Sequence, residues 1–407
     1  MAAHGPATAP APQVKPSRRG PRISRRMIYL LVWIAVLSLG GWGLRLAGDR
    51  YLRAMSVLLR LQNPNAQGFA ASFAGHAVTI QDGLAETPHG TLKFRLYVPR
   101  GVEHPGGIVL LHGIHRAGIE EPRLINFAVT MAGAGIEVMT PELEDLADYR
   151  VTPRTADVIG DAAVVLGDKM GLPKVGVLGL SFAGGLALLA ANKPEYAEKI
   201  GFVAAVGAHD DMLRVARFFA ANMIERPDGS EVTLKAHEYG VLVLAYSHIE
   251  DFFSPRDAPV AREALRLWLW EQPSDSTQTA QALSPAGRQE FETILHHREL
   301  LQPALVQEIQ RHSEEMQAVS PHGQVSTLHV PVYLLHGSTD TVIPASETLW
   351  LSKDVPQQDL KAVLISPAMN MIHVDGQHSV TTSEKWALVD FMAQVLHAAD
   401  RLGRAGR

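Results

Sequence analysis

The sequence has 407 residues, of which 46% are hydrophobic and 19% are charged, a globular composition that excludes wholesale disorder. Its 34 Gly and 25 Pro follow no short period, which excludes collagen-like and solenoid architectures. A net charge of −5 provides no basic excess for binding nucleic acid. The absence of cysteine from the sequence excludes disulfides, thiolate metal sites, iron–sulfur clusters and a cysteine nucleophile.

The N-terminal part of the chain combines a basic segment with a long apolar run. Residues 1–26 carry six Lys and Arg, five Pro and no acidic residue, which predicts a disordered basic tail. Residues 27–44 (MIYLLVWIAVLSLGGWGL) contain no charged side chain. A helix of this length is about 27 Å long at ~1.5 Å per residue, close to the roughly 30 Å hydrocarbon core of a bilayer. We therefore expect a transmembrane signal-anchor over residues 27–45.

A cleaved signal peptide is the alternative interpretation of this run, because Ser38 and Gly40 suit the small-residue cleavage rule. The long basic segment before the run and its continuation to Leu44 favour an uncleaved anchor. The basic residues before it predict a cytoplasmic N-terminus and an extracytoplasmic, periplasmic catalytic domain on a bacterial-type inner membrane.

Residues 46–75 are expected to form a linker that contains an amphipathic helix. Tyr51, Met55, Leu58 and other apolar residues would share one helical face. Such a helix either lies on the membrane surface or docks on the rest of the protein.

From about Gly75 the pattern changes to short apolar runs that alternate with helical segments, which predicts a mainly parallel sheet. Two antiparallel strands are expected first, at Ala77–Ile80 and Leu92–Val98. The expected buried strands follow at Gly107–Leu111, Ile136–Thr140, Lys174–Leu180, Phe202–Val206, Val330–Leu335 and Leu360–Ile365. The expected helices are Arg123–Ala132, Thr155–Lys169, Phe182–Ala191 and Glu384–Ala399. The α/β core is thus assigned to residues 76–210 and 329–400, followed by a tail at 401–407.

The alternation is interrupted over residues 211–328, which is too long for a structureless loop. Apolar residues recur with helical period at Ala261–Trp270 and Gln289–Gln317, with almost no strand signal. We predict a helical lid inserted after the sixth strand.

The most informative motif is a serine between an apolar strand and an apolar helix, where residues 179–184 read Gly-Leu-Ser-Phe-Ala-Gly. A serine on such a turn takes a strained backbone, and small neighbours let the strand and the helix pack closely. Gly179, Ala183 and Gly184 provide them, although Ala183 departs from the usual G-x-S-x-G form. A plain N-cap would explain Ser181 but not its neighbours. We therefore predict that Ser181 is a nucleophile.

A His-Gly pair, His112 and Gly113, ends an earlier strand. Acyl transfer requires backbone N–H groups that face the developing oxyanion. Ile114 and Phe182 follow the His-Gly pair and the serine, and we predict that they form this oxyanion hole. A glycine turn that leaves a strand would by itself explain the His-Gly pair, but the serine turn favours the functional interpretation.

Two aspartates could orient the base. Asp340 lies in the string HGSTDTVIP (residues 336–344), directly after the strand VPVYLL. Asp210 follows the sixth strand. Although aspartates in turns are more often caps, the position of Asp340 after its strand favours it as the acid.

Two histidines after the last expected strand could be the base. His373 follows that strand by a loop of suitable length and has apolar neighbours, whereas His378 lies in a more polar stretch. We favour His373 and keep His378 as the alternative.

From about Ala77 to Leu396 the chain resembles the α/β-hydrolase superfamily, including the serine–acid–histidine order. The HGSTDTVIP string is similar to the acid loop of esterases, lipases and peptidases of this fold. The resemblance implies a mostly parallel eight-stranded sheet, flanked by helices, with Ser181, Asp340 and His373 at its carboxyl edge. Serine stands where dehalogenases and epoxide hydrolases carry aspartate, which implies acyl transfer.

These features predict a membrane-anchored serine hydrolase that cleaves a carboxylic ester or a related acyl bond. No metal or organic cofactor is expected, because the 18 His show no ligand spacing. The apolar segment LRLWLWE (residues 265–271) and the anchor favour a small-molecule or lipid-like ester. An acyltransferase with the same triad and a catalytically inactive binding module are the alternatives. The sequence leaves the oligomeric state open.

Overall fold

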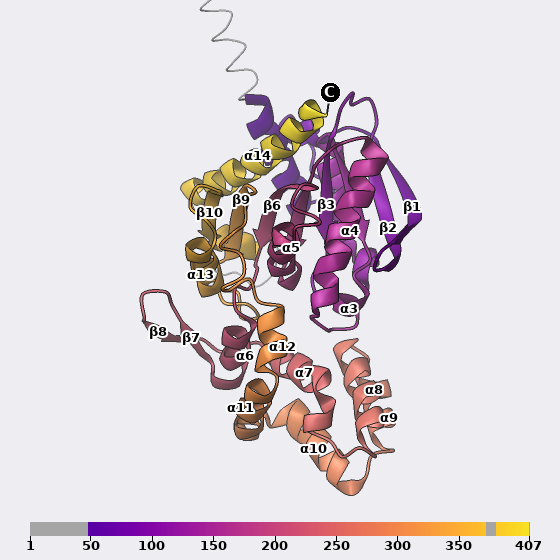
Figure 1. Ribbon diagram of the computed structural model, residues 1–407, viewed down its shortest axis with the longest axis vertical. Coiled ribbons are helices and arrows are strands. Elements are labelled where there is room, and N and C mark those ends of the chain that lie inside the picture. The colour runs from indigo at the N-terminus through magenta and orange to yellow at the C-terminus, as the bar shows by residue number, and fades with distance from the viewer. Residues whose placement is uncertain (1–47, 372–379, 407) are drawn as a thin grey trace, which may run out of the picture. The chain divides into compact units, whose positions relative to one another are not determined.

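The computed structural model describes residues 48–371 and 380–406. The chain divides into two units, Met1–Asp49 and Arg50–Arg407, and every element named below belongs to the second. Within its described residues an eight-stranded sheet has the order β1-β2-β4-β3-β5-β6-β9-β10 (Figure 1). The strands are β1 (Val78–Thr87), β2 (Gly90–Pro99), β3 (Gly106–Leu111), β4 (Ile136–Pro141), β5 (Val175–Leu180), β6 (Ile200–Val206), β9 (Val332–Gly337) and β10 (Leu360–Ser366). Strand β2 runs antiparallel to β1 and β4, and the other pairs are parallel.

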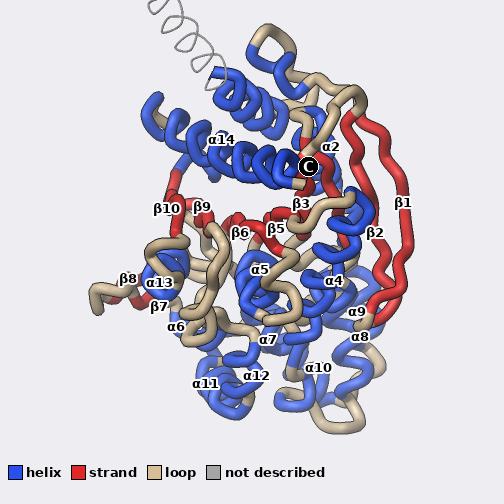
Figure 2. The backbone as a smooth tube through the Cα atoms, turned by 45° about the horizontal axis from the view of Figure 1, so that its top comes forward, coloured by secondary structure: helices blue, strands red, loops and turns tan. Residues whose placement is uncertain are grey.

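Helices cover both faces of this sheet (Figure 2). Helices α2 (Pro122–Gly133) and α14 (Thr382–Ala405) pack on one face, and α4 (Pro153–Met170) and α5 (Phe182–Asn192) pack on the other. The short α3 (Glu144–Ala147) follows β4, and α13 (Ser346–Asp354) lies between β9 and β10 in sequence. A strand that is covered on both sides reads as a continuous apolar run, and this explains why the buried strands were predictable.

Before β1, positions 50–62 of the second unit are helical and dock on the core. Arg53 forms an ion pair with Asp400 of α14, with 2.7 Å between Nη1 and Oδ2. The Tyr51 hydroxyl donates a hydrogen bond to Asp390 of the same helix at 2.7 Å. Within the second unit, these contacts fit the interpretation of this segment as a helix that docks on the rest of the protein.

The chain between β6 and β9 forms a mainly helical insertion, residues 207–331 (Figure 1). Its helices are α6 (Met212–Ala221), α7 (Glu238–Ser247), α8 (Ala258–Leu269), α9 (Pro273–Ala280), α10 (Pro285–His296), α11 (Gln302–Arg311) and α12 (Ser313–Ala318). The periodic stretch Gln289–Gln317 belongs to three of these helices rather than to one. Pro303 lies in the first turn of α11, a position that proline tolerates because the N–H groups there have no helical partner.

The insertion also holds a hairpin that the sequence pattern did not predict. Strands β7 (Met223–Glu225) and β8 (Glu231–Thr233) pair antiparallel, and Gly229 in the turn between them has a φ of 80°. Strands of this length are too short to show an alternating pattern, so only the turn residues could have indicated them.

Several sequence predictions fall outside the described residues: the apolar run over 27–44, and both candidate bases, His373 and His378. Among the helices that are described, none has the length and hydropathy needed to span a bilayer.

Candidate active site

Ser181 occupies the turn between β5 and α5, with a φ of 56° and a ψ of −135°. The left-handed region is unfavourable for a residue with a Cβ, so the surrounding packing must maintain this conformation. A Cβ on Gly179 would lie 2.6 Å from the Ala183 carbonyl oxygen, and one on Gly184 would lie 2.9 Å from the Ala208 Cβ. The small side chains predicted for this turn are thus required for the close approach of the helix to the strand.

The loop after β3 lies directly against this serine. A Cβ on Gly113 would be 3.1 Å from the Ser181 Cβ and 3.8 Å from its Oγ. His112 fixes this loop, because its Nδ1 lies 2.7 Å from the Gly113 carbonyl oxygen and its Nε2 accepts a hydrogen bond from the Leu143 N–H at 3.0 Å. Burial lowers the pKa of His112 to about 4, so its imidazole is neutral at pH 7 and serves as a positioning group.

The two predicted oxyanion residues directly follow the two residues of this contact in sequence. Phe182 is the first residue of α5, where the backbone N–H has no partner within the helix. Ile114 is half-buried and follows Gly113 on the loop that lies against Ser181.

Asp340 lies on the loop that follows β9. Its Oδ1 accepts hydrogen bonds from the backbone N–H groups of Val342 and Ile343, at 2.8 and 3.0 Å. Its Oδ2 lies 3.7 Å from the position of a Cβ on Gly207, at the end of the neighbouring strand β6. Two backbone bonds therefore orient the carboxylate, and its side chain remains 31% exposed.

The competing aspartate has different surroundings. Asp210 is fully buried, and its Oδ2 lies 2.7 Å from Nη2 of Arg214 on α6. Glu347 of α13 forms a second ion pair with Arg214 at 2.6 Å and accepts the backbone N–H of Asp210 at 3.0 Å. Burial raises the pKa of Asp210, as do the carboxylates of Asp354 and Glu347, whereas Arg214 lowers it. This cluster joins the insertion to the core, and it engages the Asp210 carboxylate in an ion pair with Arg214.

The insertion contacts the core close to the acid loop. The His237 N–H, just before α7, donates a hydrogen bond to the carbonyl of Thr341, the neighbour of Asp340, at 2.8 Å. On the other side, the Tyr149 hydroxyl donates to the carbonyl of Leu269 in α8 at 2.8 Å. These two bonds also connect the insertion to the core, the first of them next to the acid loop.

The parallel strands bring most of the predicted site residues to one edge of the sheet. The Ser181 N–H donates to the Val206 carbonyl at the end of β6 (2.8 Å), and the Ser338 N–H in the acid loop donates to the Ser366 carbonyl at the end of β10 (3.3 Å). Both candidate bases follow β10 in sequence. Their side chains lie outside the described residues.

The strand order and the strained serine turn are those of the α/β-hydrolase fold, as predicted. No model of a known protein family and no curated protein matches the sequence.

Solved structures of esterases and hydrolases are similar to the chain. An esterase of Pyrobaculum calidifontis has 15% identity and a TM-score of 0.42, over 81% of this chain and 88% of that one. Brefeldin A esterase, a bacterial homologue of human hormone sensitive lipase, has 12% identity and a TM-score of 0.47, over 88% and 87% of the two chains. A 2-hydroxy-6-oxo-6-phenylhexa-2,4-dienoate hydrolase of Rhodococcus sp. strain RHA1 has 18% identity and a TM-score of 0.39, over 80% and 100%.

The Arg214 cluster leads to a prediction about stability. Arg214→Met removes the guanidinium and leaves the carboxylates of Asp210 and Glu347 buried without their partner. We expect the free energy of unfolding to fall by roughly 3 kcal/mol or more, as measured by urea denaturation. The control is Arg217→Met, an exposed position on the same helix, which should change it by less than about 0.5 kcal/mol. Equal effects of the two changes would contradict the role of the cluster.

Proposed function

We propose that the protein is a serine hydrolase that cleaves a carboxylic ester or a related acyl bond. The observation that carries this proposal is the strained backbone of Ser181, with a φ of 56°, at the turn between β5 and α5. A turn of this kind holds a serine hydroxyl exposed at the edge of the sheet, where it can reach an acyl carbon. An ordinary N-cap serine has a β-region backbone and needs no such strain.

In the proposed mechanism the Ser181 hydroxyl attacks the carbonyl carbon of the ester while the base takes its proton. The negative charge then develops on the carbonyl oxygen. The backbone N–H groups of Ile114 and Phe182 would stabilise this oxygen. The contact between Gly113 and Ser181 supports this assignment, because it brings the two backbone segments together.

Asp340 and His373 are proposed to complete the triad. The Asp340 carboxylate would orient the imidazole and stabilise its cation, and His373 would return the proton to the leaving alcohol. Water activated by His373 then hydrolyses the acyl-enzyme and releases the acid. The fixed orientation of Asp340, which the backbone of Val342 and Ile343 provides, supports its choice over the ion-paired Asp210.

We further propose that the insertion acts as a lid over this site and that the substrate is a small-molecule or lipid-like ester. The hydrogen bond between His237 and Thr341, next to Asp340, supports a position beside the catalytic groups. The apolar run over residues 27–44 and the basic residues before it support anchoring in a bacterial-type inner membrane.

The nucleophile is tested by Ser181→Ala, which removes one oxygen. We expect turnover of p-nitrophenyl esters of increasing chain length to fall at least about a thousandfold, and labelling by a serine-directed phosphonate to be lost. Ser274→Ala, an exposed serine of α9, should retain both. Undiminished turnover in the Ser181 variant would remove the hydrolase mechanism. Product transfer to added alcohols in place of water would instead indicate an acyltransferase.

The acid and the base are tested by four alanine variants, at Asp340, Asp210, His373 and His378. Turnover of one activated ester should collapse for Asp340→Ala and His373→Ala, because a serine hydroxyl is a poor nucleophile without its base. Circular dichroism separates loss of activity from loss of fold, which matters most for the buried Asp210. An active Asp340 variant beside a folded, inactive Asp210 variant would move the acid to the end of β6. An active His373 variant beside an inactive His378 variant would move the base.

Membrane topology is tested with protease added to spheroplasts. The basic residues before the apolar run predict that the hydrolase domain lies outside the cytoplasm, so the protease should digest it in intact spheroplasts. Protection until lysis would contradict this orientation. A mature N-terminus near Gly41 would show a cleaved signal peptide rather than an anchor.

A further inference from the structure

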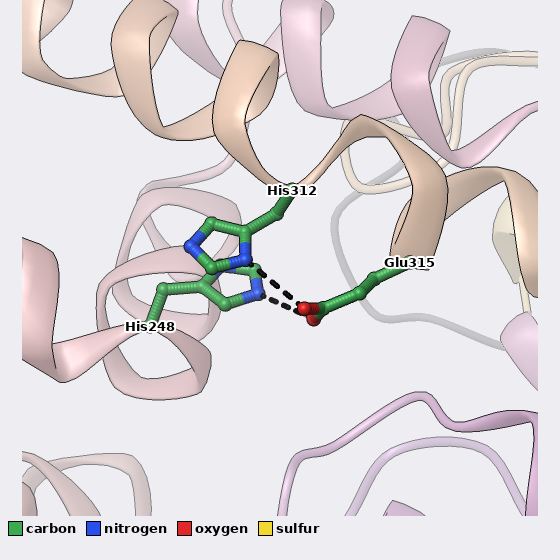
Figure 3. Close-up of side chains that lie close together, drawn as sticks. All are labelled: His248, His312 and Glu315. Carbon is green, nitrogen blue, oxygen red and sulfur yellow. Dashed lines mark hydrogen bonds and ion pairs between the residues drawn. The ribbon is translucent and has the colours of Figure 1, made fainter.

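Two histidines and a glutamate meet within the insertion, away from the proposed triad. His248 lies directly after α7, and His312 lies at the junction of α11 and α12. Glu315 belongs to the first turn of α12. Figure 3 shows the two imidazole rings stacked, with the Glu315 carboxylate facing both. The rings are 3.7 Å apart and nearly parallel, at 9°.

Each imidazole turns one nitrogen toward Glu315. His312 Nδ1 lies 3.3 Å from Oε1, and His248 Nε2 lies 3.6 Å from Oε2. One ligand atom from each of the three residues lies within 4.8 Å of the others. Glu315 is 71% exposed, whereas the two histidines are mostly buried, so the cluster is open to solvent on the carboxylate side.

The remaining nitrogen of each ring is bound to a second carboxylate. His248 Nδ1 pairs with Glu308, and His312 Nε2 lies 2.9 Å from Asp251. A carboxylate that accepts the far N–H of a histidine fixes its tautomer and is the usual support of a metal-binding imidazole. With these protons in place, the nitrogens that face Glu315 carry lone pairs when the rings are neutral. Acceptors then face acceptors, so that either a proton on one ring or a metal ion must link these nitrogens to Glu315.

The charges around the three residues also favour a bound cation. Arg311 pairs with Asp251, and the cluster then retains the carboxylates of Glu308 and Glu315 without a guanidinium. Glu308 is 1% exposed, and its Oε2 has no hydrogen-bond partner among the described residues. Protonation of both rings would place two imidazolium cations face to face at the stacking distance. A single divalent ion would satisfy both nitrogens and the Glu315 carboxylate together.

We propose that His248, His312 and Glu315 bind a divalent transition-metal ion, with Zn²⁺ as the best match. Two imidazole nitrogens and one carboxylate oxygen are a common zinc ligand set, and they leave a fourth position for water. Coordination by both nitrogens requires the parallel rings to tilt toward one another. The ion would link the end of α7 to the α11–α12 junction and thereby stabilise the insertion.

The proposal is tested on the full-length, untagged protein by equilibrium dialysis against Zn²⁺, with bound metal measured by mass spectrometry. We expect one equivalent in the unmodified protein. Saturating Zn²⁺ should raise the melting temperature by about 3 °C or more. Cobalt in place of zinc should give visible ligand-field absorption. No zinc uptake, or zinc uptake without a change in melting temperature, would overturn the proposal.

Matched variants locate the ion. Glu315→Gln, at an exposed position that should not disturb folding, should weaken binding at least about tenfold, and His312→Gln should weaken it further. Glu314→Gln removes the same charge at the adjacent exposed position and should bind zinc as the unmodified protein does. His322→Gln removes a histidine from a second cluster, with Asp210 and Asp354. Loss of zinc in the His322 variant but not in the Glu315 variant would place the ion at that cluster and overturn the proposal.

Discussion

The arrangement of the core depends on one local constraint, the left-handed backbone of Ser181. A residue with a Cβ maintains such a conformation only where its surroundings leave no alternative. Here the helix after the serine lies so close to its strand that a side chain on Gly179 would overlap the backbone of Ala183. The strain is therefore balanced by the packing of α5 on the sheet, which buries an almost wholly apolar helix.

The close packing around Ser181 also determines the position of the loop that follows β3. Gly113 has no Cβ, so the loop after β3 can lie against Ser181. His112 connects this loop to Leu143, because its Nε2 accepts a hydrogen bond from the Leu143 N–H. A buried neutral imidazole that accepts a backbone N–H is a rigid support. Gly113 thus permits the contact between this loop and Ser181, and His112 maintains it.

Much of the core was predictable because its strands are buried on both faces. Runs such as the one in β5 carry no polar residue, and the small residues around Ser181 have a steric reason that is visible in sequence. The choice between Asp340 and Asp210 was harder, because both follow strand ends. The two aspartates differ in their partners. Arg214 follows Asp210 by only four residues, but Glu347 is far from both in sequence, and no local pattern reveals its ion pair with Arg214.

Two features of the insertion were not predicted from the sequence. The three-residue strands β7 and β8 are too short to be periodic. His248 and His312 show no ligand spacing because they follow different helices, α7 and α11, and meet only through the packing of the insertion. A spacing rule detects ligands on one helix or one loop, so it cannot detect this pair.

The pairing of β6 with β9 has a consequence for the order of folding. These strands are hydrogen-bonded neighbours, yet the whole insertion separates them in sequence. Bringing them together from an extended chain would require closing a very long loop, and loop closure of that kind slows folding. If the insertion collapses first through its own helix contacts, its two ends approach each other and the closure becomes effectively short. The buried ion pairs of Arg214 lie at the base of the insertion, so they require these two ends to be close together.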